Sequence, residues 1–277
     1  MGFPHSGVVE SQFSLHLARL AQLAPNDLVL FGVFLSMPAA QDALGKLKGY
    51  DHLLPDIRHV TLKRVWDLPT RLFHWTLVVC ICGMLVTAQL GGNAMQWHFR
   101  FGYAVLVLVV FRLVWGFVGG YWSRFSVFLS SPSAALAYAR TPFAKRTDSV
   151  GHNPLGAWSV LAMLLATLLQ VGAGLFSDDD IGTSGPLARY ASNQWVGWAT
   201  HYHTGLGKFA LFGLIALHVG TVVWYRVKHK HDLVRSMVHG DKLLRDDAPA
   251  SVDTLSTRLF AAMVLTACAC TVFWLLP

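Results

Sequence analysis

Three histidines lie in one apolar stretch between His201 and Tyr225, and imidazoles in such a setting can bind a metal. The stretch is long enough to cross a bilayer, for which about 20 apolar residues suffice. Ionisable side chains inside a membrane span are costly, so their presence indicates a function. Neutral imidazole is a common axial ligand of haem iron, and His203 and His218 lie fifteen residues apart.

This spacing predicts two binding levels. On a helix the side chains of His203 and His218 lie about 60° apart around the axis and about 22 Å apart along it. One imidazole therefore lies near each face of the membrane, which suits two stacked haems. Each iron needs a second axial ligand, and that ligand must come from another span.

Composition places the chain among integral membrane proteins. Of its 277 residues, 54% are hydrophobic and 13% are charged, against about 25% charged residues in soluble domains. The apolar runs are too long for barrel strands and predict helical spans at 68–90, 97–118, 154–175, 196–225 and 259–276. Asp67 is the predicted N-cap of the first span, with Pro69 in its first turn. The expected fold class is an all-α membrane protein, a four-helix transmembrane bundle holding two haems, plus one extra C-terminal transmembrane helix.

The distribution of basic residues indicates which partners the chain binds, and the cysteine motifs indicate which type of haem it can hold. Basic residues lie between the spans without a stripe of exposed aromatics, so we expect membrane lipid and no nucleic acid as a partner. Cys80, Cys82, Cys268 and Cys270 lie within apolar runs and are interpreted as packing residues. No C-x-x-C-H motif occurs, which excludes covalent c-type haem and leaves b-type haem.

The charges of the loops predict how the chain is oriented in the membrane. Basic residues gather before the first span and after the second and fourth, so the positive-inside rule places the N-terminus in the cytoplasm. The C-terminus and the acidic loop are then outside. That loop carries Asp178, Asp179 and Asp180, which form either a solvated loop or a docking patch for a basic partner.

With this orientation of the chain, the position of each histidine in its span gives its depth in the membrane. His74 lies about 9 Å from the cytoplasmic face and His218 about 15 Å from the same face. His98 and His203 open their spans at the outer face. The four histidines therefore fall at two levels, two per level and from different helices, which predicts axial ligation by all four. Any one of them alone is as well explained as a packed or interfacial histidine.

Other residues fit this arrangement. Gly102 and Gly207 each follow a histidine by four residues and so share its helix face, where they leave room for a macrocycle. Packing between helices is the alternative use of these glycines. Arg112 lies fourteen residues after His98 and needs an anionic partner, such as a haem propionate, unless it snorkels to the interface.

The outer ligand of the fourth span is either His201 or His203. On a regular helix His201 is offset from His218 by about 20° and His203 by about 60°, which favours His201. The following Gly207 and the greater depth in the span favour His203, which we prefer. The end of a helix can rewind by about 60°, and the two haems need not be coplanar.

The chain resembles the bacterial cytochrome b561 family, related to the b-type subunits of nickel–iron hydrogenases and the gamma subunits of formate dehydrogenases. The matching stretches are WDLPTRLFHW (66–75), HFRFGYAVLVLVVFRLVWGFVG (98–119), GHNPLGAW (151–158), GLFSDDDIGTSGPLA (174–188) and HTGLGKFALFGLIALHVG (203–220). The resemblance implies two b haems, with His74 paired to His218 and His98 to His203. The family usually spaces its two ligands on the fourth span by fourteen residues, closer to His203 than to His201.

The resemblance also implies electron transfer across the bacterial inner membrane, between the quinone pool and a partner such as a cytochrome c, a hydrogenase or another dehydrogenase. The alternatives are a superoxide:quinone oxidoreductase and a haem or metal transporter without redox turnover. Candidates for quinone contacts are Trp66, Arg71 and Trp75, which also fit an interfacial belt. No catalytic residue is predicted.

The predicted organisation has three parts. Residues 1–60 form an N-terminal extension, partly amphipathic or disordered, and the organised chain begins near Val60. Residues 61–245 form the di-haem four-helix domain, and residues 246–277 form a linker and the C-terminal transmembrane helix. His229, His231 and His239 are a less favoured metal site, because Lys228 and Lys230 repel cations.

Overall fold

The computed structural model describes residues 60–142, 149–229, 232–245 and 248–276. Within these ranges five helical segments are long and apolar enough to cross a membrane. They are α4 (Leu68–Leu90), α5 (Met95–Val118), α8 (Pro154–Phe176), α10 (Gly207–His229) extended by α9 (Asn193–His201) and the π-helical turn η5 (Tyr202–Leu206), and α12 (Leu255–Leu275). The five predicted spans are confirmed, and the chain is a multi-pass membrane protein.

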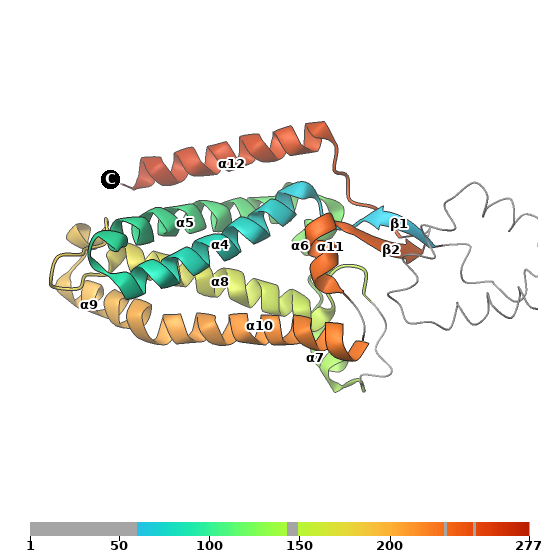
Figure 1. Cartoon of the computed structure of the whole chain (residues 1–277), viewed down its shortest axis with the longest axis horizontal. Helices are drawn as coiled ribbons and strands as arrows, with labels where there is room; N and C mark the ends of the chain where they lie inside the picture. Colours follow the sequence, from blue (N-terminus) through green and yellow to red (C-terminus); the bar gives the residue numbers. More distant parts are fainter. Residues whose placement is uncertain (1–59, 143–148, 230–231, 246–247, 277) are drawn as a thin grey trace, which may run out of the picture.

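Four of these segments form a bundle, and α12 lies along α5 on its outside (Figure 1). The short turn η1 (Gly92–Ala94) joins α4 to α5. One buried cluster draws Phe73 from α4, Trp115 from α5 and Leu164 from α8 together with Ala261 from α12. The C-terminal helix therefore shares the core of the four-helix bundle. Cys80 and Cys268 are buried in this core as the sequence predicts, whereas Cys82 and Cys270 are exposed, and all four are free thiols.

Polar caps decide where the spans begin. The Asp67 carboxylate accepts a hydrogen bond from the backbone N–H of Thr70 at 2.9 Å, and Pro69 lies in the first turn of α4. Asn153 caps α8 in the same way, directly before Pro154. A cap of this kind satisfies an N–H that the first turn of a helix leaves free. The predicted cap of the first span is confirmed.

One end of the bundle carries a small two-stranded sheet, and we call it the sheet end (Figure 1). Strand β1 (Val60–Arg64) pairs antiparallel with β2 (Asp241–Arg245), and α11 (Leu233–His239) leads into β2. Ser251 joins the same assembly, because its N–H donates to the Arg64 carbonyl and its hydroxyl to the Val65 carbonyl. The segments before α4, after α10 and before α12 are thus hydrogen-bonded to one another. The three-part division of the chain stays a prediction, and residues 1–59 lie outside the described residues.

The opposite end carries the connection between α8 and α9, residues 177–192, and we call it the hairpin end. A bridge between Asp178 and Ser184 closes this connection into a hairpin-like loop, followed by η4 (Ala188–Tyr190). At the sheet end, the link from α5 to α8 contains η2 (Tyr121–Ser123), α6 (Phe125–Phe128) and α7 (Pro132–Arg140). Both ends therefore carry structured connections that cover the helix termini.

Candidate metal centres

Four histidines form two facing pairs inside the bundle. His98 of α5 and His203 of η5 lie toward the hairpin end with ring centroids 6.2 Å apart, and His74 of α4 and His218 of α10 lie toward the sheet end with centroids 6.4 Å apart. Two imidazoles that bracket one metal ion have centroids about 6.2 Å apart, given about 2.0 Å for each metal–nitrogen bond and about 1.1 Å from nitrogen to ring centre. Each pair has the spacing at which one metal ion fits between the rings.

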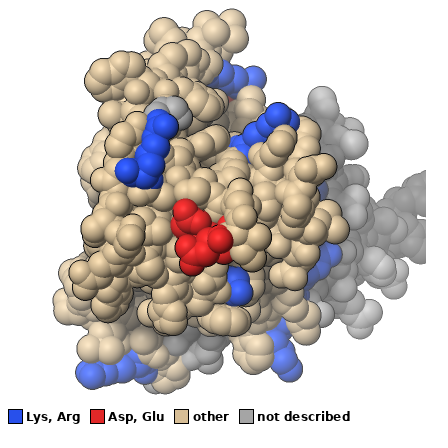
Figure 2. Space-filling view, turned by 90° about the vertical axis from the view of Figure 1, so that its left-hand side faces the viewer, with Lys and Arg blue, Asp and Glu red and all other residues tan. Residues whose placement is uncertain are grey.

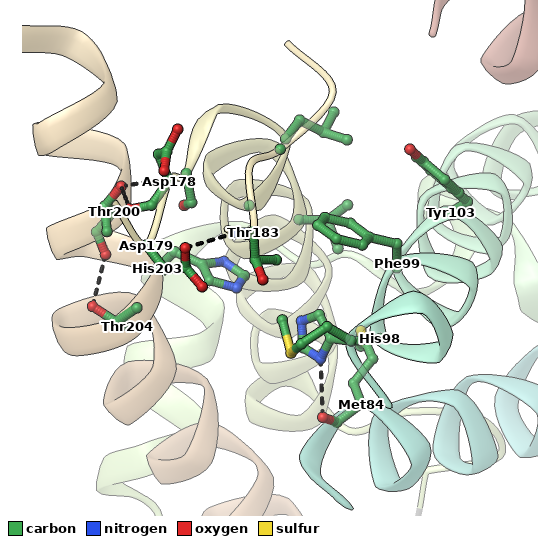
Figure 3. A pocket seen from close by; sticks show the side chains of 17 residues that line it. Met84, His98, Phe99, Tyr103, Asp178, Asp179, Thr183, Thr200, His203 and Thr204 are labelled. Carbon is green, nitrogen blue, oxygen red and sulfur yellow. Dashed lines mark hydrogen bonds between the residues drawn. The ribbon is translucent and has the colours of Figure 1, made fainter. Parts of the chain in front are cut away.

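Backbone carbonyls orient the pair at the hairpin end. Nδ1 of His98 lies 3.1 Å from the Met84 carbonyl, and Nδ1 of His203 lies 2.8 Å from the Gln170 carbonyl. A carbonyl can only accept, so each Nδ1 carries the proton and each Nε2 keeps its lone pair. Metal-binding histidines typically donate their other N–H in this way. Figure 3 shows the two imidazoles projecting into the same space from different helices.

A cavity of about 140 Å³ lies beside this pair. Gly102 borders it, and a Cβ added there meets nothing within 4 Å. A Cβ added at Gly174 would instead lie 2.8 Å from the His203 ring. Gly102 thus leaves open space beside the histidines, as expected, and Gly174 leaves room for one of the imidazoles. One part of the remaining lining is apolar, with Met84, Met95, Phe99, Tyr103, Val171 and Leu175, and the other is polar, with Ser177, Asp178, Asp179, Thr183, Thr200 and Thr204.

The expectation for Gly207 needs correction. A Cβ on Gly207 would collide with the side-chain oxygen of Gln170 and the ring of Tyr202. Protein atoms therefore fill the space that a macrocycle was expected to use, and Gly207 allows α8 and η5 to pack closely. The glycine that serves His203 is Gly174, which the sequence analysis missed. Its only signal is the small-residue run Gly172 to Gly174 near the end of the third span.

The π-helical turn decides which histidine of the fourth span faces the cavity. Gly205, with φ −113° and ψ −105°, interrupts the regular helix between His203 and His218. A π-helical turn accommodates an extra residue and so changes the direction of the side chains that precede it. His203 consequently faces His98, whereas His201 is exposed. The helical offset from His218 had favoured His201. That argument does not hold, because it assumed a regular helix between these residues.

The pair at the sheet end has different surroundings. Nδ1 of His74 is buried and has no hydrogen-bond partner among the described residues. Arg112 is only 3% exposed, so it does not snorkel to the surface, and its guanidinium lies 5.2 Å from the Phe125 ring and 5.8 Å from the Phe128 ring. Its Nη1 is also buried and finds no hydrogen-bond partner in the described part of the chain. A buried guanidinium of this kind fits an anionic ligand group.

The acidic loop covers the cavity at the hairpin end. Asp178 and Asp179 line it, and the Asp179 carboxylate accepts hydrogen bonds from the backbone N–H groups of Gly182, Thr183 and Ile181. These bonds hold the pKa of Asp179 well below its usual range. Figure 2, which faces this end, shows the acidic side chains gathered near the centre of the face, with basic side chains scattered around them. The loop is thus internally ordered as well as charged.

The three residues considered for quinone contacts lie at the sheet end. Trp66 is buried and packs against His152, with ring centroids 4.9 Å apart. Arg71 donates to the Val238 carbonyl at 2.6 Å and lies 3.9 Å from the Asp253 carboxylate. Nε1 of Trp75 donates to the Met237 carbonyl at 3.3 Å. Arg71 and Trp75 therefore fasten α11 to α4, and their use in a ligand site stays a prediction.

The alternative metal site in the basic segment is only partly described. His239 is exposed at the end of α11, while His231 and the side chain of His229 lie outside the described residues. Across the described part of the chain, no group of three or more His, Cys, Asp or Glu side chains is arranged to hold a metal ion. The two facing histidine pairs remain the candidate centres.

The family model of prokaryotic cytochrome b561 matches residues 65–240, which include all four paired histidines. The chain belongs to the prokaryotic cytochrome b561 family. It is a b-type cytochrome, with haem b as cofactor, that transfers electrons in a membrane. Haem would fit these sites, because imidazoles are its axial ligands. The pair at the hairpin end borders open space, and the buried Arg112 at the sheet end would suit a haem carboxylate.

Two relatives illustrate the similarity of this cytochrome to known proteins. It is 26% identical over 228 residues to a probable Ni/Fe-hydrogenase B-type cytochrome subunit of Azotobacter vinelandii, covering 70% of this chain and 93% of that relative. It is 23% identical over 208 residues to a probable Ni/Fe-hydrogenase 1 B-type cytochrome subunit of Escherichia coli K12, covering 64% of this chain and 88% of that relative. No solved structure gives a significant match.

Proposed function

We propose that this cytochrome carries electrons across the bacterial inner membrane through two b haems, one held by His98 and His203 and one by His74 and His218. The observation that supports this proposal is the presence of two histidine pairs, each spaced for one metal ion and each drawn from two different spans. Haem iron supplies one-electron chemistry by alternating between the ferric and ferrous states. The chain contributes the ligands, their orientation and an apolar surrounding that excludes water.

The two pairs lie at different depths of one bundle. His203 and His218 are fifteen residues apart on the fourth span, which corresponds to about 22 Å of helix, within a hydrocarbon core of about 30 Å. An electron that enters at one end of the bundle therefore needs only one transfer between the two centres to approach the other membrane face.

We place the sheet end in the cytoplasm. Basic residues gather there on and around β1, β2 and α11, whereas Asp178, Asp179 and Asp180 lie at the hairpin end. The positive-inside rule associates short basic segments with the cytoplasm. His74 and His218 then form the inner site, and His98 and His203 form the outer site, which is covered by the acidic loop.

A hydrogenase is the partner that the relatives favour, because both are named as Ni/Fe-hydrogenase B-type cytochrome subunits. We propose exchange with the quinone pool as the second connection of this electron path. A basic cytochrome c is the alternative partner, supported only by the acidic cluster at the hairpin end.

Purified full-length protein is expected to contain two haems b per chain, both with bis-histidine spectra and both reducible by a quinol. A pyridine haemochrome assay normalised to protein concentration measures the stoichiometry, and an anaerobic titration with quinol tests the reduction. One haem per chain or none would contradict the two-site proposal. Haem that exchanges freely and is not reduced by quinol would instead favour transport without redox turnover.

Gly102→Leu is expected to lower the haem content from two to one per chain. The Cβ of a leucine at this position meets no described protein atom within 4 Å, so the substitution does not disturb the packing. The rest of the side chain projects into the open space beside His98. Gly213→Leu on α10 is the matched control, because a Cβ there also meets nothing within 4 Å and the residue is exposed away from the cavity. Equal haem contents in the two variants would show that the open space at Gly102 does not hold the cofactor.

A further inference from the structure

His152 lies at the sheet end, directly before the residue that caps α8, and electron transfer as proposed above gives it no role. Its ring packs against Trp66 and Phe128, with centroid distances of 4.9 and 5.0 Å. Its Nδ1 is buried and has no hydrogen-bond partner among the described residues. A buried polar atom without a partner costs about 1–3 kcal/mol, so this position indicates a ligand group.

Arg112 is the charged neighbour of His152. Both side chains lie against the ring of Phe128, and both present a buried nitrogen without a partner, Nη1 of Arg112 and Nδ1 of His152. Burial lowers the pKa of His152 to about 3, and the charges of Arg112 and Lys242 and the nearby His218 act in the same direction. At neutral pH this site therefore combines one cation with one neutral imidazole.

A carboxylate is the group that satisfies both nitrogens, because it accepts from a guanidinium and from an imidazole N–H at once. Among the described residues, the two nearest candidates, Asp67 and Asp253, are already engaged. Asp67 acts electrostatically on Arg112, but its oxygens already accept from Thr70, Gly120, Trp115 and Ser123. Asp253 is engaged by the arginines Arg64, Arg71 and Arg258. The engagement of both carboxylates points to a carboxylate of a bound molecule.

We infer that His152 and Arg112 together bind one propionate of the inner haem, with Arg112 supplying the charge and His152 a neutral N–H. The inference rests on the proposed function, since it requires a haem between His74 and His218. His152 is a positioning residue in this arrangement and not an iron ligand. It fixes the carboxylate from the side of the α8 N-terminus, whereas Arg112 fixes it from α5.

This pair is expected to set the potential of the inner haem. Cationic and N–H contacts offset the negative charge of the propionate, so their loss favours the ferric state and lowers the midpoint potential. His152 has a pKa of about 3 and stays neutral at neutral pH, so it acts on this potential as a hydrogen-bond donor and not as a charge.

The test is a redox titration of both haems at neutral pH in the full-length protein. His152→Leu removes the donor, and His152→Asn keeps a neutral N–H near the position of Nδ1. His239→Leu is the matched control, an exposed histidine at the same end of the bundle. All variants are compared with wild type for haem content before titration.

His152→Leu is expected to shift the one-electron reduction equilibrium of the inner haem about tenfold toward the ferric state, equivalent to about 59 mV. His152→Asn should restore most of the potential, while the outer haem and the control stay unchanged. If His152→Leu lowers haem content, His152→Asn decides, because it must then restore both the haem content and the inner potential. An unaltered inner potential in His152→Leu with two haems present, or no recovery in His152→Asn, overturns the inference and leaves the proposed function intact. A wild-type protein with no inner haem overturns the proposed function itself.

Discussion

His203→Ala is expected to remove the outer haem, whereas His201→Ala should leave both haems in place. The reason is the π-helical turn, which directs His203 to within 6.2 Å of the His98 ring centroid and leaves His201 exposed. The haem content should fall from two to one per chain in the first variant only. Pyridine haemochrome assays and reduced-minus-oxidised spectra measure this difference.

The two substitutions control for one another, since both remove an imidazole at the start of the same span. A general effect of losing a histidine at the membrane surface would appear in both variants. Loss of the outer haem in His201→Ala, with both haems retained in His203→Ala, would show that the fourth span uses the other ligand. Loss in both variants would indicate this general effect and would contradict a specific ligand role for His203.

Asp67→Ala is expected to destabilise the protein by about 3 kcal/mol or more, because it leaves at least three buried donors unpaired at about 1–3 kcal/mol each. The Asp67 carboxylate is fully buried and accepts from the Thr70 N–H at 2.9 Å, the Gly120 N–H at 2.9 Å and Nε1 of Trp115 at 3.2 Å. It joins the start of α4 to the end of α5. Thermal unfolding followed by circular dichroism in detergent measures the loss.

Asp232→Ala is the control for this variant. Asp232 also caps a helix, since it accepts from the Arg235 N–H at 2.9 Å, but its further partner is the exposed Arg226. Loss of a simple cap costs about 1 kcal/mol. Similar losses in Asp67→Ala and Asp232→Ala would mean that the contacts of Asp67 with α5 contribute little.

Long apolar runs made the five spans predictable, because a membrane leaves helices as the means of satisfying the backbone. The pairing of His74 with His218 and of His98 with His203 also followed, since ionisable residues inside spans are few and their depths can be counted along a helix. The structure brings these residues together in the expected pairs, and their ligand role stays a proposal.

Contacts between helices could not be predicted from one sequence. Gly102 and Gly207 occupy equivalent positions after their histidines, yet one borders open space and the other packs against Gln170 and Tyr202. Nothing in the spacing distinguishes them, because the neighbour of each is set by the packing of another span. His152 was overlooked for the same reason, since the residues that make it interesting, Trp66, Arg112 and Phe128, come from three other segments.

The pairing of β1 with β2 also constrains how the protein is made. Val60 and Arg245, which face each other in this sheet, are separated by 185 residues, so at about 5–20 residues per second the ribosome takes about 9–37 s to deliver the second strand after the first. Because β2 follows α10 in the chain, the sheet can close only after α4, which carries His74, and α10, which carries His218, have both been synthesised. A haem held by His74 and His218, as proposed, would therefore be bound late in biogenesis, and a chain stalled before α10 would present His74 without its partner.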